Sequence, residues 1–187
     1  MKSRARLVLI VIAALSLLFL IDQWRRTRLE SSQDKIILTA SQKYGVDPAL
    51  VKAVVWRESR FDPHAHGSKA EVGLMQIMEI TGREWAGEQH VPSFSVNILW
   101  EPGQNIDCGT WYLGKLLRRY TKTDDPVPYA LADYNAGRGN VLKWIKDDAA
   151  TNSTVFVEQI RFPSTRDYVR NVMQRRKKYA GQFEKLP

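Results

Sequence analysis

The sequence predicts an all-α fold, with one globular domain behind a short apolar N-terminal segment. Apolar residues recur at helical spacings from Ser31 onward, no segment alternates convincingly as a strand does, and helix start and stop signals separate the periodic stretches. The chain has 187 residues, of which 44% are hydrophobic. That is enough material for one well-buried domain of ordinary size, and too little for two.

The composition of the N-terminal segment, residues 1–30, predicts a membrane anchor and stalk. An apolar run from Leu7 to Ile21 is interrupted only by Ser16, and basic residues flank it on both sides. As a helix this run would rise roughly 22 Å, short of the roughly 30 Å of a hydrocarbon core, although Trp24 can lie at the interface. A cleaved signal peptide is the alternative, but no small-x-small cleavage site follows the run. We therefore expect one transmembrane helix, and a domain over residues 31–187.

Helix signals divide the rest of the chain into successive segments. Gly45 is a stop, and Asp47-Pro48 is an N-cap followed by proline at the first helical position. Three glycines between residues 73 and 87 predict only short helices over residues 68–90. We expect longer helices at residues 36–44, 47–59, 106–120, 129–135, 139–146 and 164–180, with a turn at 122–128.

Charge and cysteine content exclude several classes of protein. The formal net charge is +8, but the basic excess lies in residues 1–30 and 170–187, while the stretch between them is close to neutral. Such a distribution does not indicate a nucleic-acid groove. Cys108 is the single cysteine, which excludes an internal disulfide and a cysteine-rich zinc module. His64 and His66 have no third ligand nearby, so we expect no metal and no organic cofactor.

Glu58 lies on the apolar stripe of the helix expected at 47–59. Val51, Val54 and Glu58 follow one another at spacings of three and four. Burial there would disfavour the charged carboxylate and raise its pKa, as a general acid near neutral pH requires. Alternatively, the last turn emerges from the core and Glu58 pairs with Arg57, Arg60 or a remote basic residue. Periodicity alone leaves both readings open.

Three motifs together resemble the catalytic domain of the soluble lytic transglycosylase (SLT) family, lysozyme-like enzymes of peptidoglycan. They are Glu58-Ser59-Arg60-Phe61-Asp62-Pro63, then Gly73-Leu74-Met75-Gln76-Ile77-Met78, then Asp133-Tyr134-Asn135-Ala136-Gly137. The resemblance covers about residues 35–180. It implies a lysozyme-like (goose-type) all-α domain.

The resemblance also implies roles for individual residues. Glu58 would be the catalytic acid/base, Gln76 and Met78 would lie near an N-acetyl group of the sugar, and Tyr134 and Asn135 would close the site opposite Glu58. The stretch from Glu158 to Val169 resembles the family's C-terminal motif. It implies that Tyr168 contributes to substrate binding and that Glu158 is a second acid of the cleft. We expect Glu158 to be held by hydrogen bonds or by a basic partner such as Arg161.

The sequence departs from the family pattern at several positions. A serine common nine residues after the catalytic Glu is Gly67 here, so Ser68 could supply that hydroxyl only if the loop shifts by one residue. The Gly-Ala pair common before the Gly-Leu-Met-Gln turn is Ala70-Glu71, and an alanine common before Tyr134 is Asp133. Glu79 takes the place of a proline, and Arg161 and Ser164 stand where Pro and Glu are common. These changes affect the subsites and leave Glu58, Gln76 and Tyr134 in place.

The resemblance implies a peptidoglycan lytic transglycosylase. Such an enzyme cleaves between N-acetylmuramic acid and N-acetylglucosamine and leaves a 1,6-anhydromuramoyl end. We expect peptidoglycan strands and the membrane as partners, no nucleic acid, and a catalytic domain on the cell-wall side of the cytoplasmic membrane. The sequence identifies no protein partner. Two alternatives remain: a hydrolytic muramidase, and a non-enzymatic peptidoglycan-binding or assembly protein on the same fold.

Overall fold

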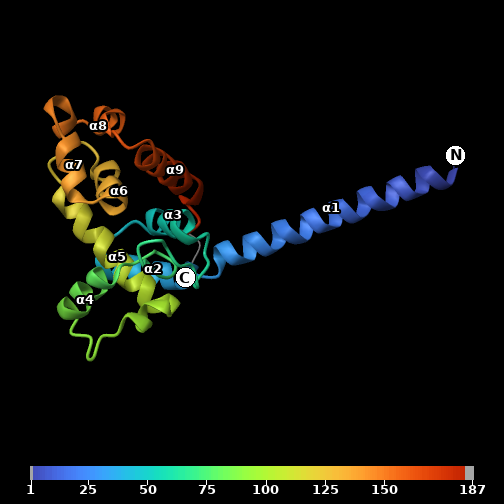
Figure 1. Ribbon diagram of the computed structural model, residues 1–187, viewed down its shortest axis with the longest axis horizontal. Helices are drawn as coiled ribbons and strands as arrows, with labels where there is room; N and C mark the ends of the chain where they lie inside the picture. The colour runs from blue at the N-terminus through green and yellow to red at the C-terminus, as the bar shows by residue number, and fades with distance from the viewer. Residues whose placement is uncertain (1, 184–187) are drawn as a thin grey trace. The chain divides into compact units, whose positions relative to one another are not determined.

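The computed structural model describes residues 2–183, apart from the side chains of residues 2–8 and 26 (Figure 1). The chain divides between Gln33 and Asp34 into two compact units, an N-terminal helix and a helical domain. The α-helices are α1 (Lys2–Ser31), α2 (Asp34–Tyr44), α3 (Pro48–Ser59), α4 (Glu79–Glu88), α5 (Pro102–Arg119), α6 (Pro126–Ala136), α7 (Arg138–Trp144), α8 (Ser153–Gln159) and α9 (Pro163–Tyr179). Two short 3₁₀ helices, η1 (Val96–Trp100) and η2 (Asp147–Ala150), lie between them. The described residues form no strand, as the sequence predicts.

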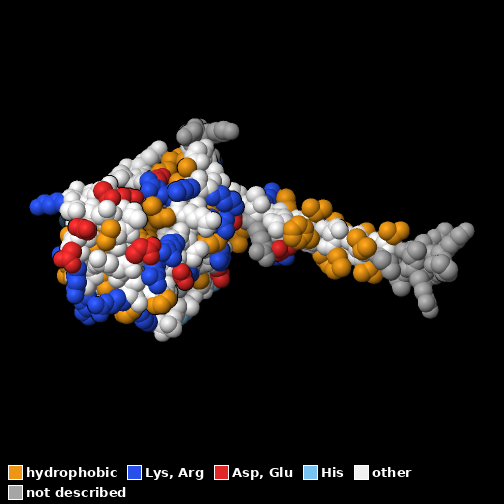
Figure 2. All heavy atoms as spheres, turned by 90° about the horizontal axis from the view of Figure 1, so that it is seen from above, with side chains coloured by type: hydrophobic (Ala, Val, Ile, Leu, Met, Phe, Trp, Pro, Cys, Tyr) orange, Lys and Arg blue, Asp and Glu red, His pale blue; other side chains and the backbone are white. Residues whose placement is uncertain are grey.

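Helix α1 carries exposed apolar side chains from Leu9 to Ile21, which Figure 2 shows on its successive turns. The helix continues past this run through Asp22 and Arg25 to Ser31. Within the described part of the chain, no helix is both long and apolar enough to cross a membrane. The expected transmembrane helix is therefore not shown. The apolar run is short, and the side chains of its first two residues lie outside those described.

The cap expected at Asp47 forms, and a second cap that was not expected starts α6 earlier than predicted. The carboxylate of Asp47 accepts a hydrogen bond of 2.9 Å from the Ala49 N–H, and α3 begins at Pro48. Asp125 likewise caps α6 through the Val127 N–H. Because of this cap, α6 begins at Pro126, inside the segment predicted as a turn.

The prediction of short helices across residues 68–90 is wrong for its first half. Residues 60–78 form a loop with two isolated antiparallel bridges, His66 to Val72 and Val72 to Ile77. A single helix, α4, follows and contains Gly82, where a Cβ would lie 2.7 Å from the Phe94 ring. Close packing therefore accounts for that glycine. Helix α8, which the sequence did not predict, is capped by Asn152.

The core of the domain forms where α3 packs along α9, α5 packs against α2 and α6, and α6 packs against α9 (Figure 1). Leu50 and Val54 on α3, Leu113 on α5, Leu131 on α6 and Val172 on α9 are all at most 1% exposed. Burial of these side chains is the main term that stabilises the arrangement. It fixes α3, and with it the position of Glu58 at the C-terminal end of that helix.

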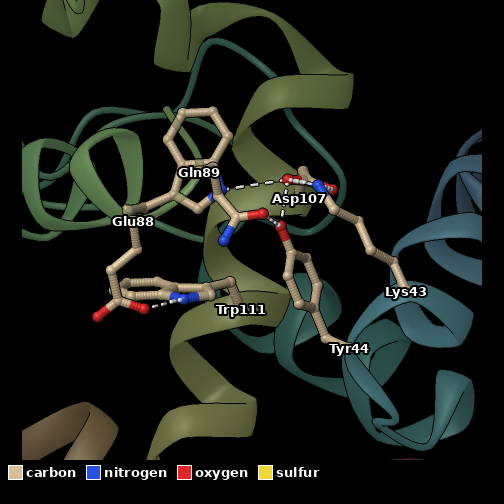
Figure 3. A network of polar contacts seen from close by, with 7 residues as sticks. Lys43, Tyr44, Glu88, Gln89, Asp107 and Trp111 are labelled. Atoms are coloured by element: carbon tan, nitrogen blue, oxygen red, sulfur yellow. Dashed lines mark hydrogen bonds and ion pairs between the residues drawn. The ribbon is translucent and has the colours of Figure 1, made fainter. Parts of the chain in front are cut away.

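A polar network joins α2, α4 and α5 (Figure 3). The Asp107 carboxylate on α5 accepts hydrogen bonds from Lys43 Nζ (2.9 Å), the Tyr44 hydroxyl (2.7 Å) and Trp85 Nε1 (3.1 Å). The Tyr44 hydroxyl also lies 3.1 Å from Gln89 Oε1. With three donors on one carboxylate, the charge of Asp107 is well compensated. The network thus joins three helices through one carboxylate.

Candidate active site

Glu58 stands in the last turn of α3, directly before the chain leaves the helix. Arg60 and Phe61 adopt left-handed backbone conformations (φ 55° and 66°), which end α3. Val54 and Val51, one and two turns earlier on the same face, are fully buried. The Glu58 side chain continues this stripe and reaches a cavity of about 510 Å³. The reading in which Glu58 extends the apolar stripe therefore agrees with the structure.

The pKa of the Glu58 carboxyl is raised to about 7. Burial is the main cause, and it outweighs the hydrogen bond from Tyr168 and the positive charge of Arg57, both of which lower the pKa. The negative charge of Glu71 adds to the increase. Burial also raises the pKa of Tyr168 well above its ordinary value, so its hydroxyl stays protonated and donates to Glu58. Glu58 can thus both hold and release a proton near neutral pH.

The turn from Gly73 to Gln76 brings Gln76 to the wall of the cavity, and three side chains from distant elements fix the turn. Ser59 Oγ donates to the Leu74 carbonyl (2.8 Å). The Tyr134 hydroxyl donates to the Met75 carbonyl (2.7 Å), and Asn105 Oδ1 accepts from the Met75 N–H (2.7 Å). The turn is therefore attached to α3, α6 and α5 at once. Such multiple attachment fixes the position of Gln76 in the cavity that Glu58 lines.

Asn105 holds this turn from behind, a role that the sequence did not indicate. It is fully buried, and its Nδ2 donates to the carbonyls of Val72 (2.9 Å) and Leu99 (2.8 Å). Gly73, at φ 75°, lies against it, and a Cβ at Gly73 would meet the Leu99 carbonyl oxygen at 2.8 Å and the Asn105 amide. The donors and the acceptor of one buried amide thus serve the backbone of the turn and of η1.

Most of the predicted site residues meet in the same cavity. Its lining includes Glu58, Ser68, Gln76, Met78, Tyr134 and Asn135. Tyr168 is not among the lining residues. It is 1% exposed and contacts the site through Glu58. Tyr168 therefore holds the Glu58 carboxylate through a hydrogen bond and does not face the cavity.

Glu158 lies elsewhere. Its side chain is 61% exposed and accepts a hydrogen bond of 2.6 Å from Arg170. It lines a separate cavity between α8 and α9, together with Met173. The structure therefore does not place Glu158 beside Glu58, and its basic partner is Arg170 in place of the expected Arg161.

The structure places two of the residues that depart from the family pattern beside the cavity. Asp133 is 1% exposed and accepts hydrogen bonds from the Tyr120 hydroxyl (2.8 Å) and Arg119 (3.1 Å), so it joins α5 to α6. Glu71 and Asp133 both line the cavity with Glu58, and the sequence did not indicate a place for Glu71 in the site. The described residues contain no group of three or more His, Cys, Asp or Glu side chains that could hold a metal ion.

Comparisons with known proteins agree with this geometry. The family model for the transglycosylase SLT domain matches residues 35–157. The membrane-bound lytic murein transglycosylase C of Shigella sonnei (strain Ss046) is 37% identical over 121 residues, which cover 60% of this chain and 33% of that protein.

Solved structures show the same fold. The lytic transglycosylase Slt of Pseudomonas aeruginosa, solved as an inactive glutamate-to-glutamine mutant, superposes with a TM-score of 0.76 and 28% identity over 84% of this chain and 25% of that one. The 70 kDa soluble lytic transglycosylase of Escherichia coli gives a TM-score of 0.70 and 28% identity over 78% of this chain and 24% of that one. The 70 kDa soluble lytic transglycosylase in complex with bulgecin A gives a TM-score of 0.72 and 27% identity over 81% of this chain and 24% of that one. The chain thus spans about a third of the curated relative and about a quarter of these structures.

Proposed function

Because the chain belongs to the transglycosylase SLT domain family, we propose that it is a peptidoglycan lytic transglycosylase with Glu58 as its acid/base. The reaction cleaves the β-1,4 bond between N-acetylmuramic acid and N-acetylglucosamine and leaves a 1,6-anhydromuramoyl end. The observation that carries the proposal is the position of Glu58, a partly buried carboxyl with a pKa of about 7 that faces the cavity. The relatives named as lytic transglycosylases support the same activity.

One carboxyl group is sufficient for this chemistry. Protonated Glu58 donates its proton to the glycosidic oxygen, the bond to C1 of the muramic acid breaks, and the neighbouring 2-acetamido group stabilises the positive centre. Glu58, now a carboxylate, takes the proton of the C6 hydroxyl as that oxygen bonds to C1. The carboxyl regains its proton, and no water is consumed. Tyr168 keeps Oε1 of Glu58 in one place through both steps.

A hydrolytic muramidase is the second candidate, because Glu71 gives the cavity a further carboxylate that could orient a water, whereas Asp133 is bonded to Arg119 and Tyr120. Mass spectrometry of muropeptides released from purified peptidoglycan separates the two. We expect anhydromuramoyl ends, lighter by one water (about 18 Da) than the reducing ends of a hydrolase. Reducing ends as the main product would identify a muramidase. Saturable binding without soluble product would identify a binding protein.

We also propose that α1 attaches the domain to a membrane and that the domain works outside the cytoplasm. The exposed apolar side chains from Leu9 to Ile21 support attachment, because so large an apolar surface is unfavourable in water. The name of the Shigella sonnei relative, which is membrane-bound, points the same way. Cell fractionation of the full chain should find it with membranes, and replacement of Leu15 and Leu18 by Asp should release it. A reporter fused after Pro187 should be active outside the cytoplasm only.

A further inference from the structure

Gly67 leaves a space in the cavity wall that two side chains occupy. A Cβ added at Gly67 would clash with Oε2 of Glu71 and would lie 2.8 Å from Oε1 of Gln76. Gly67, Glu71 and Gln76 all line the cavity that Glu58 faces. Two oxygen atoms of different side chains therefore converge on the place where any other residue at position 67 would put its side chain.

Both of these oxygens are hydrogen-bond acceptors. Gln76 Nε2 donates to the carbonyls of Ala65 and Gly73, each at 2.9 Å, which settles the orientation of the amide and directs Oε1 away from those carbonyls. Glu71 Oε2 accepts from the Lys69 backbone N–H at 2.7 Å. An ionised carboxylate has about four acceptor positions, so this one contact leaves capacity for a ligand.

A pair of fixed acceptors in a cavity favours a ligand that brings donors. A carboxylate acceptor binds an O–H or N–H group more strongly than a neutral acceptor does. The glycan carries such donors as sugar hydroxyl and amide N–H groups. Glu71 also affects Glu58 through its charge, which agrees with their shared cavity.

We propose that Glu71, with Gln76, forms a subsite that binds a hydroxyl or amide N–H donor of the glycan and thereby positions the saccharide against Glu58. The subsite depends on Gly67, because a side chain there would displace the Glu71 carboxylate. This inference rests on the proposed function, since it takes the substrate to be a peptidoglycan strand. It assigns Glu71 to substrate binding and gives it no part in activating a water.

Binding to a catalytically disabled protein tests the subsite without turnover. The probe is a soluble tetrasaccharide of alternating N-acetylglucosamine and N-acetylmuramic acid, titrated calorimetrically into the full-length Glu58→Gln protein. We expect Glu71→Ala in that background to weaken binding about tenfold, which corresponds to about 1.4 kcal/mol. Glu71→Gln keeps an acceptor but loses the charge, so it should weaken binding less. Glu101→Gln, which removes an exposed carboxylate outside the cavity, is the matched control.

Replacing Gly67 gives a second test of the subsite in the same binding experiment. Gly67→Ala should weaken binding about as much as Glu71→Ala, and the double variant should bind no worse than either single variant, because both changes remove the same contact. Additive losses would overturn the proposal. The proposal would also be overturned if both Glu71 variants bound the tetrasaccharide as tightly as the Glu101→Gln control. If Glu71→Ala fails to fold, Glu71→Gln decides the question alone.

The reaction product of Glu71→Gln in an enzyme that keeps Glu58 distinguishes substrate binding from a role of Glu71 in activating water. Glu71→Gln should raise KM and leave the identity of the product unchanged. A switch from reducing to anhydromuramoyl ends in that variant would contradict the proposal. If the wild-type protein makes no anhydromuramoyl product while the binding results hold, the proposed function fails and the subsite stands.

Discussion

The Tyr168 hydroxyl on α9 donates a hydrogen bond of 2.6 Å to Oε1 of Glu58 on α3, joining residues 110 positions apart in the chain. Tyr168 is 1% exposed, and α3 and α9 pack along each other, so the bond is part of the core. A hydrogen bond to the ionised form of a carboxyl opposes the effect of burial on its pKa. Tyr168 therefore both orients the Glu58 carboxyl and limits the rise of its pKa.

Tyr168→Phe should move the pH dependence of the reaction. Glu58 must be protonated to act as an acid, so its pKa sets the alkaline limb of kcat/KM. Loss of the hydrogen bond raises that pKa, and the limb should shift to higher pH, while kcat falls about tenfold because Oε1 is less well held. Tyr129→Phe is the control, since it removes a buried hydrogen bond to the Ala149 carbonyl outside the cavity. A limb that stays in place in Tyr168→Phe would refute the assigned role.

Glu58→Gln should change stability in a pH-dependent way. The folded-state pKa of about 7 lies above the ordinary 4.5, so the native state binds the proton more tightly than the unfolded chain does. Wild-type stability therefore falls as pH rises from about 4.5 to 7, by about 3 kcal/mol. The variant lacks this loss. Urea unfolding should show near-equal stability at pH 4 and a more stable variant at pH 8. The same difference at both pH values would show that Glu58 is not perturbed.

Asn105→Ala should damage both the fold and the site. The change leaves the Met75 N–H and the carbonyls of Val72 and Leu99 without their buried partner, at a cost of about 3 kcal/mol or more. Gln104→Ala, one residue earlier and exposed, should stay within about 0.5 kcal/mol of wild type. Chemical unfolding measures both. An Asn105→Ala protein as stable as the Gln104→Ala control would mean that the turn is held by other contacts.

Glu158→Gln should leave the activity nearly unchanged. Its carboxylate is exposed and pairs with Arg170 outside the cavity of Glu58, and an exposed ion pair contributes little to stability. We expect a rate within about twofold of wild type and the same product, measured as solubilised peptidoglycan. A loss as large as that caused by Glu58→Gln would restore Glu158 as a second acid.

The sequence was informative where local signals and motifs determine the structure. The Asp47 cap and the spacing of Val51, Val54 and Glu58 define α3 and the direction of the Glu58 side chain, and both features depend on a few neighbouring residues. The family motifs then added Gln76 and Tyr134, which the structure brings to the same cavity.

Long-range side-chain contacts account for what the sequence did not reveal. Residues 68–78 are a loop because the Met75 backbone bonds to Asn105 and Tyr134, on α5 and α6, and those partners are invisible to a local reading. For the same reason the sequence could assign Tyr168 to the site but could not show that its hydroxyl donates to the Glu58 carboxyl. The role of Glu71 became apparent only from the space beside Gly67.

The most direct test of the account is the release of soluble muropeptides from purified peptidoglycan by wild-type and Glu58→Gln proteins. Gln is nearly isosteric with Glu and can still accept the Tyr168 hydrogen bond, but it cannot donate and recover a proton. We expect the wild type to release anhydromuramoyl products, and the folded variant to be at least about 10²-fold to 10⁴-fold slower. A folded Glu58→Gln protein that keeps half of the wild-type rate would contradict the assignment of Glu58 as the catalytic acid/base.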